Sequence, residues 1–216
     1  MPCDPFEMKL VHRGFRREFH NTADLVRGVS RGDVQCAAVV GEHIEFMMTV
    51  LHHHHLAEDG VVWPRLSARV PSRAAEIKRM EDAHRAIDET GDRLRSTVVQ
   101  WAQTGDSWLA GQLLPLIEDF SRRIDEHFDD EESKVVPLIA EYLSPKEWRK
   151  FLAHGSAFVR AHPRRGLALG AIVLDGEPVE SKERFLGNVP LFARAAYKMF
   201  GERVYAGYRT QVYGSA

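Results

Sequence analysis

Two stretches of this 216-residue chain share one pattern: HHHHLAEDGVVWP at residues 52–64 and EHFDDEESKVVP at residues 126–137. Each holds a histidine, a glutamate four residues later and a proline six residues after that glutamate, and the copies lie 73 residues apart (127 minus 54). A histidine and a glutamate four apart lie on one face of an α-helix, so both can bind one ion. The duplication therefore predicts a paired metal site between two helices.

The run His52–His55 leaves open which of its histidines belongs to the metal site. Successive residues of a helix point about 100° apart, so the whole run cannot face one ion. Both His54 with Glu58 and His55 with Asp59 have the four-residue spacing, but only His54 and Glu58 also reproduce the proline spacing of the second copy. We therefore assign His54 and Glu58 to the site. We expect the other three histidines to be solvated or to lie behind the ligands.

Two further histidines, His20 and His84, stand upstream of the two copies, and each has an aspartate four residues later. The order along the chain becomes His, His-x-x-x-Glu, His, His-x-x-x-Glu. In helix bundles, metal sites are built from side chains that face one another in the core. We therefore add His20 and His84 to the predicted ligands. The candidates for orienting their rings, or alternatively for solvated surface charges, are Asp24, Asp88, Asp59 and Glu81.

The hydrophobic pattern has a helical period through most of the chain, and no stretch alternates as a strand does. Beyond Ser144 the sequence breaks into short pieces separated by glycine and proline. We expect an all-α fold: an up-down-up-down four-helix bundle in residues 1–143, with a short helical C-terminal extension, residues 144–216, packed on it. The expected helices are residues 6–29, 33–66, 71–101 and 108–142, with shorter ones at 145–159 and 189–200.

Composition narrows the class of function. The chain has 29 basic and 31 acidic side chains, which disfavours nucleic acid or an anionic membrane as the main partner. Cys3 and Cys36 lie far from the histidine clusters, so a disulfide scaffold and a thiolate metal site are both disfavoured. The first ten residues contain no long apolar run. We expect a cytoplasmic protein that uses nitrogen and oxygen ligands and acts on small molecules.

From about Met8 to Tyr142, this arrangement resembles the hemerythrin-like (HHE cation-binding) family. The resemblance implies a non-haem di-iron centre in the bundle core, bridged by two carboxylates and an oxo or hydroxo group. Glu58 and Glu131 would be the bridging carboxylates. The terminal ligands would be His20 and His54 on one iron and His84 and His127 on the other.

The sequence departs from the oxygen-carrying members of that family. Where they have a histidine four residues before the third-helix ligand, this chain has Met80, and the residue five after His127 is Glu132 instead of aspartate. The six-ligand set resembles the bacterial type linked to iron-centre repair and to nitric oxide or peroxide chemistry. It implies open positions at both irons, with an apolar wall from Met47, Met48, Val50, Val61, Met80 and Phe128.

Several alternatives remain open at this point. An imidazole and carboxylate set also suits zinc or manganese. The ferritin-like pattern Glu-x-x-His occurs once, at Glu81 and His84, without a second copy. We expect the centre to bind or reduce hydrogen peroxide, oxygen or nitric oxide in redox or nitrosative stress defence, as an oxidoreductase if it is an enzyme. The alternative is a di-iron sensor or iron store without turnover. Whether the protein is a monomer or a dimer is left open.

Overall fold

The structure, a computed structural model, describes residues 3–214 and all of their side chains except those of residues 155–160. Within that range every regular element is a helix, so the predicted all-α class is confirmed. The helices of the N-terminal part are α1 (Phe6–Gly28), α2 (Val34–Ala57), η1 (Glu58–Val62), α3 (Trp63–Arg69), η2 (Pro71–Arg73), α4 (Ala74–Ala102), α5 (Ser107–Asp130), η3 (Glu131–Val135) and α6 (Val136–Tyr142). The C-terminal part holds α7 (Pro145–Ala161), α8 (Pro163–Leu174), α9 (Val179–Asn188) and α10 (Leu191–Tyr213).

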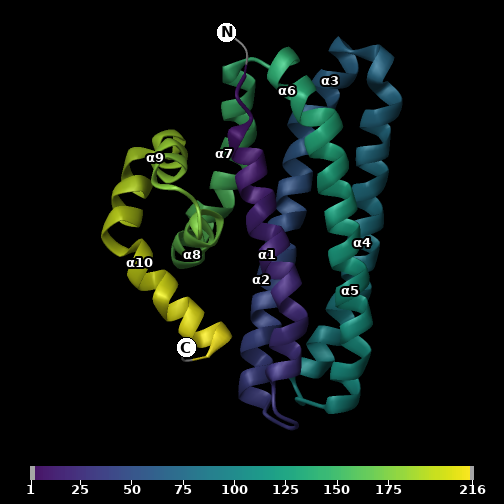
Figure 1. The fold of residues 1–216 in the computed structure, drawn as a ribbon, viewed down its shortest axis with the longest axis vertical. Helices are drawn as coiled ribbons and strands as arrows, with labels where there is room; N and C mark the ends of the chain where they lie inside the picture. The colour runs from purple at the N-terminus through teal and green to yellow at the C-terminus, as the bar shows by residue number, and fades with distance from the viewer. Residues whose placement is uncertain (1–2, 215–216) are drawn as a thin grey trace.

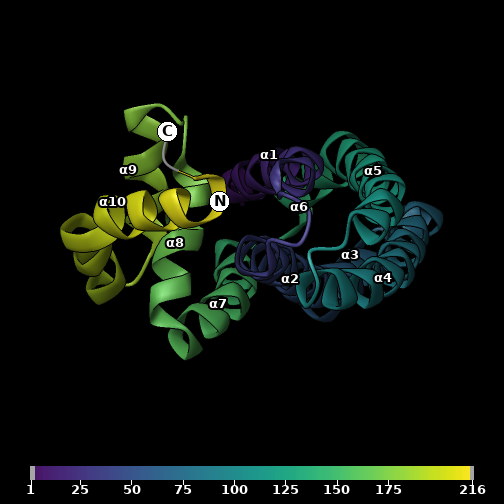
Figure 2. The same ribbon diagram turned by 90° about the horizontal axis from the view of Figure 1, so that it is seen from below.

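Helices α1, α2, α4 and α5 form the predicted four-helix bundle, in which α1 contacts α2 and α5, and α4 contacts the same two helices (Figures 1 and 2). The loops after α1 and α4 meet at one end, where the backbone N–H of Gly32 donates to the carbonyl of Gly105 at 2.9 Å. Gly105 has φ +58°, and a Cβ there would lie 3.0 Å from the backbone of Asp33. The side chains of Asp33 and Asp106 cap the N-termini of α2 and α5. The first of these caps agrees with the helix boundary expected at residues 30–33.

The two metal-site motifs coincide with two irregular turns. The helical path widens to a π turn in η1 and again in η3, each beginning at the glutamate of its motif. Pro64 and Pro137 follow in the first turns of α3 and α6. A proline lacks the N–H and clashes with the carbonyl four residues before it, and a π turn accommodates this by inserting one residue. The fourth predicted helix, residues 108–142, is therefore interrupted at its metal motif.

The bundle core has two apolar layers, one in the long middle section and one at the end near α3, α6 and α7. A polar layer separates them at one level on every helix, and it holds the histidines and glutamates of the two motifs. The apolar residues that bracket this layer are Met8 and Phe15 on α1, Leu51 and Ala57 on α2, Met80 and Ile87 on α4, and Phe128 and Val135 on α5 and η3.

The C-terminal helices pack against one side of the bundle, where α7 contacts α2 and α8 contacts α1 (Figure 2). Two of the four, α8 and α9, were not predicted, because glycine and proline in this region disguise the helical period. Gly170 on α8 and Gly201 on α10 both lie against the ring of Tyr197. A Cβ would lie 3.6 Å from this ring at Gly170 and 2.9 Å from it at Gly201. The small residues here serve close packing of α8 on α10.

The continuous segment Val34–Arg69 is long and apolar enough to cross a membrane by length and composition. In the structure, 56% of its most apolar window is buried inside the protein. It also carries buried histidine and glutamate side chains. The core helix of a bundle meets the same test, and this segment packs within the bundle against α1 and α4.

Candidate metal centre

The polar layer brings five histidines and two glutamates together in the core. They come from all four bundle helices and from the two π turns, so the centre depends on the whole bundle. The side chains are nearly inaccessible, with His54 the most exposed at 9%. The seven residues are His12, His54, His55, Glu58, His84, His127 and Glu131.

One half of the cluster is formed by His12, His54 and Glu58. The Nε2 atoms of His12 and His54 lie 3.2 Å apart, and His54 Nε2 lies 3.1 Å from Glu58 Oε1. Glu131 Oε2 approaches from the opposite side, 3.5 Å from His12 Nε2. These four donors can converge on one metal ion.

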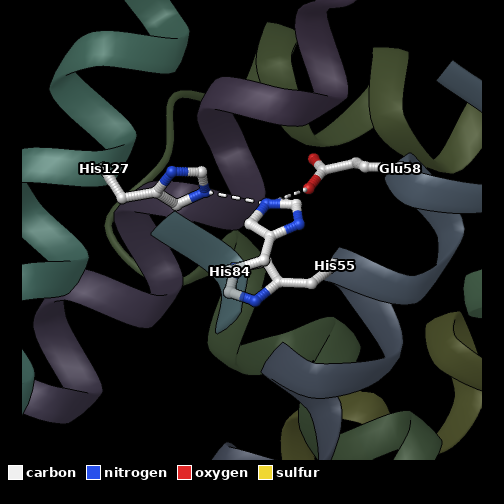
Figure 3. A group of neighbouring side chains, drawn as sticks. All are labelled: His55, Glu58, His84 and His127. Atoms are coloured by element: carbon white, nitrogen blue, oxygen red, sulfur yellow. Dashed lines mark hydrogen bonds and ion pairs between the residues drawn. The ribbon is translucent and has the colours of Figure 1, made fainter. Parts of the chain in front are cut away.

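The other half contains His55, His84, His127 and again Glu58, each with a donor atom within 4.8 Å of the others (Figure 3). His84 Nε2 lies 3.1 Å from His127 Nε2 and 3.4 Å from Glu58 Oε2, and the ring of His55 stacks on that of His84. Glu131 Oε2 is 3.6 Å from His127 Nε2. Glu58 thus directs one oxygen to each half, and Glu131 lies between the halves as well.

The donor atoms fit a pair of cations because the carboxylate oxygens and the ring of His55 lack hydrogen-bond partners among the residues that the structure describes. Both carboxylate oxygens of Glu58 and of Glu131 are buried without a hydrogen-bond partner of acceptable geometry, and so are both ring nitrogens of His55. A buried carboxylate without a partner is costly, whereas metal coordination compensates its charge. Imidazole and carboxylate donors without thiolate match iron, manganese or zinc.

A second set of contacts fixes the rings. His84 Nδ1 donates to Asp59 Oδ1 at 2.8 Å, and His12 Nδ1 donates to Glu132 Oε1 at 3.0 Å. Asp59, the residue after Glu58, therefore holds a histidine of α4, and Glu132, the residue after Glu131, holds a histidine of α1. In the neutral imidazole, a hydrogen bond donated by Nδ1 leaves the lone pair on Nε2, which is the atom that faces the cluster. Both rings are oriented for metal binding before any metal arrives.

Burial also sets the protonation of the metal-free cluster. Burial raises the pKa of Glu58 well above its ordinary value, and the neighbouring charge of Glu131 raises it further. Burial lowers the pKa of His54, His55 and His127, and the neighbouring imidazoles add to this. Burial alone would lower the pKa of His84, but its contacts with Asp59 and Glu58 outweigh burial and raise it to about 10. Metal binding at this site must therefore displace protons.

Five of the six sequence-predicted ligands lie in this cluster, and His20 does not. The side chain of His20 is 54% exposed and its Nε2 lies 2.7 Å from Asp125 Oδ2 on the surface of α5. His12 takes the place on α1 that we had given to His20. Eight residues along a helix correspond to about 12 Å, so only one of the two histidines can be level with Glu58.

The sequence also contains a signal for His12. The offset of 73 residues between the motifs places the partner of His84 at residue 11, one residue from His12 and nine from His20. His55 was also missed, because only His54 has the glutamate and proline spacing of the second copy and we assigned that histidine of the run alone to the site. Adjacent helix positions point in different directions, which lets His54 and His55 serve different halves of the cluster.

The structure chooses between the two alternatives that the sequence left open for the candidate ring-orienting acids. Asp24 pairs with Arg27 on the surface, and Asp88 lies 3.2 Å from the exposed His52, so neither touches a cluster histidine. Asp59 is the aspartate that does. The six residues predicted as an apolar wall are all buried. Among them Phe128 stacks on the ring of His12, with 3.8 Å between ring centroids.

A four-helix bundle with a buried histidine and carboxylate cluster of this kind defines a metal-binding bundle protein. The family model described as the hemerythrin HHE cation binding domain matches residues 6–139, more than half of the chain. The chain therefore belongs to the hemerythrin HHE family, and the predicted family is confirmed. The Arabidopsis thaliana protein "Zinc finger protein BRUTUS" is 23% identical over 147 residues, which is 68% of this chain and 12% of that much longer protein. No solved structure matches the chain.

Proposed function

We propose that this protein is a non-haem di-iron protein whose centre binds or reduces a small oxidant, namely hydrogen peroxide, oxygen or nitric oxide, in redox or nitrosative stress defence. The observation that carries the proposal is the set of four buried carboxylate oxygens without a hydrogen-bond partner of acceptable geometry, surrounded by five imidazoles. The donors divide into two groups, each with its own histidines, which favours two cations over one. Iron in such a site would supply redox change and polarisation of a bound molecule.

The two halves of the cluster have unequal donor sets, which suggests where a small molecule binds. His12 and His54 serve one half, whereas His55, His84 and His127 serve the other, and the two glutamates are shared. The half with two histidines therefore has the fewer protein donors. We place the small molecule there. This replaces the expectation of six ligands with equal openings at both metals.

The surroundings of that half favour an apolar diatomic molecule or peroxide over a larger substrate. The rings of Phe15, Phe128 and Phe151 surround His54 with centroid distances of 5.7, 6.5 and 5.9 Å. Arg16 lies over the outer side of the Phe128 ring. Aromatic walls exclude water and strengthen the electrostatic interactions inside the site.

Metal analysis of protein purified without added metal tests the centre. We expect two iron ions per chain, and we expect their removal by a chelator to lower the thermal stability, because a metal that binds only the folded state stabilises it. Zinc or manganese in place of iron would overturn the redox part of the proposal. Retention of full stability without any metal would overturn the centre itself.

Turnover separates an enzyme from a binding protein. We expect hydrogen peroxide consumption by the iron-loaded protein, lost in Glu58→Ala and retained in His52→Ala. The control is matched, because His52 lies on the same helix but is 46% exposed and pairs with Asp88. Equal activity in the two variants would show that the cluster is not the site of the reaction.

A second candidate function is a sensor or iron store without turnover, and one contact favours it. Phe151, on α7 of the C-terminal extension, packs edge-on against the ligand His54, and Trp148 stacks on Phe151. Trp148 also donates to the buried carboxylate of Glu7 on α1 at 2.9 Å. A change at His54 can therefore alter the docking of α7. Protease cleavage after Ser144 that depends on metal oxidation state, in protein without peroxide turnover, would support this candidate over the enzyme.

The cellular location and the partners of this protein are also proposals. We propose a cytoplasmic protein that needs no nucleic acid or membrane, and both cysteines are free thiols in the structure, as a reducing compartment would leave them. Cell fractionation tests the location. The BRUTUS protein of Arabidopsis thaliana is about eight times longer than the matched region, so nothing of its overall activity is transferred.

A further inference from the structure

A second pocket lies away from the metal centre, between the bundle helix α2 and the C-terminal helices α8 and α10. Its volume is about 220 Å³. His43, which lines it, precedes the metal ligand His54 by 11 residues, or about 16 Å along α2. No residue of this pocket belongs to the metal cluster, so the proposed function does not explain it.

The inner wall of the pocket is polar and buried. His43 is only 2% exposed, and its Nδ1 lies 2.6 Å from the hydroxyl of Tyr208. Burial raises the pKa of Tyr208, so the phenol keeps its proton and donates it to Nδ1. The hydrogen of the neutral imidazole is then on Nε2. That atom is buried without a hydrogen-bond partner, and the nearest carboxylate oxygen, on Glu18, is 3.7 Å away.

The outer wall carries two arginines, Arg164 and Arg165, from the first turn of α8. Neither forms an ion pair with a side chain that the structure describes, and Arg165 lies over the ring of Phe46 at 5.7 Å. The single acidic residue among the lining side chains is Glu42, which is exposed. Arginine presents a planar array of donors that suits a carboxylate.

The remaining wall is apolar except for Gln211. Val39 and Phe46 on α2 face Ala168 on α8 and Val204 and Val212 on α10. An apolar wall beside two arginines matches a molecule with a hydrophobic body and one anionic end, and it does not match an inorganic anion. For scale, a dry cavity of roughly 150 Å³ is enough to bind benzene. The pocket therefore has room for a single ring or a short branched chain with its charged group.

We propose that this pocket binds a small organic carboxylate with an aromatic or branched apolar body. Its carboxylate pairs with Arg164 and Arg165, its body lies against Phe46, and His43 with Tyr208 forms the polar inner wall. Such a ligand touches α2, α8 and α10 at once. Its binding therefore stabilises the docking of the C-terminal extension on the bundle.

Calorimetric titration of the full-length protein with benzoate tests the proposal, alongside benzyl alcohol as a neutral analogue and inorganic phosphate as an anion without an apolar body. We expect benzoate to bind and to raise the melting temperature, and both analogues to bind at least about tenfold more weakly, as the loss of one charge-assisted pair implies. No binding of benzoate at millimolar concentration, or equal binding of phosphate, would overturn the proposal.

Substitutions in the pocket and outside it test where benzoate binds. We expect Arg164→Met with Arg165→Met to weaken benzoate binding at least about tenfold, and Arg31→Met, a control at an exposed loop arginine, to leave it unchanged. Circular dichroism and iron content confirm that each variant folds and keeps its metal centre. A double variant that is folded, loaded with metal and still binds benzoate as tightly as the parent would refute the assignment of this pocket.

Discussion

Asp59 Oδ1 accepts a hydrogen bond from Nδ1 of His84 at 2.8 Å. This bond joins the residue that follows Glu58 to the cluster histidine of α4. Glu132 makes the equivalent bond to His12 at 3.0 Å in the opposite direction. The two halves thus orient each other's ligands. Groups that hold a metal-binding histidine in this way commonly contribute 10- to 100-fold, as an order of magnitude, to metal affinity.

Asp59→Asn should therefore weaken the binding of one of the two metals by about 10- to 100-fold, since an amide is a poorer acceptor for the imidazole N–H. Asp88→Asn is the matched control, because Asp88 also faces a histidine, the exposed His52. Competition with a chromophoric chelator measures both affinities. Equal affinities in the two variants would mean that Asp59 does not orient His84.

His12→Ala should lower the metal content, whereas His20→Ala should leave it at the level of the parent protein. The reason is position: His12 is fully buried with its Nε2 3.2 Å from that of His54, and His20 is on the surface beside Asp125. Elemental analysis of both variants, purified in parallel, gives the answer. Loss of metal in His20→Ala alone would restore our sequence-based assignment and contradict the structure.

Phe128→Ala should destabilise the metal-free protein by about 3–5 kcal/mol, the usual cost of removing a fully buried aromatic side chain. Phe128 has no exposed surface and stacks on His12 at an interplanar angle of 7°. Phe192→Ala, at a side chain that is 67% exposed, should change stability by no more than about 0.5 kcal/mol. Urea unfolding of chelator-treated protein measures both changes, and similar midpoints would contradict the packing described.

Acid should destabilise the contact between the bundle and the C-terminal extension through His43. Burial lowers the pKa of His43 from 6.5 to about 4, so the unfolded chain takes up the proton first as the pH falls. The stabilisation by neutral His43 is complete above about pH 6.5 and is lost progressively towards pH 4, by up to about 3 kcal/mol at about 1.4 kcal/mol per pH unit. Glu18, Tyr208 and Tyr213 are the titratable groups that face it.

His43→Gln should therefore show a smaller fall in melting temperature between pH 7 and pH 5 than the parent, with His154→Gln, at an exposed position, as the control. The metal-free form is the one to measure, because the cluster histidines titrate with metal release. If the parent and His43→Gln lose stability in parallel, His43 is not a source of the acid sensitivity.

The helical period and the duplicated motif were sufficient to predict the four bundle helices, the loop at residues 30–33 and the class of site. Their physical basis is local: a histidine and a glutamate four residues apart share a helix face wherever the helix lies. The π turns were not predicted as such, although the proline six residues after each glutamate marks them. A proline requires a local change in helical hydrogen bonding, but the sequence does not say which change occurs.

The sequence by itself determined that Glu58, Glu131, His54, His84 and His127 belong to one candidate metal site. The tertiary structure decided which residues of the other helices lie at the same height along the bundle axis. His12 and not His20 enters the cluster, because the height of α1 relative to α2 and α5 depends on packing along the entire bundle. Asp59 and not Asp24 or Asp88 holds a ligand ring, for the same reason. Spacing within one helix is fixed by the chain, whereas register between helices is fixed only by the apolar layers that pack above and below the centre.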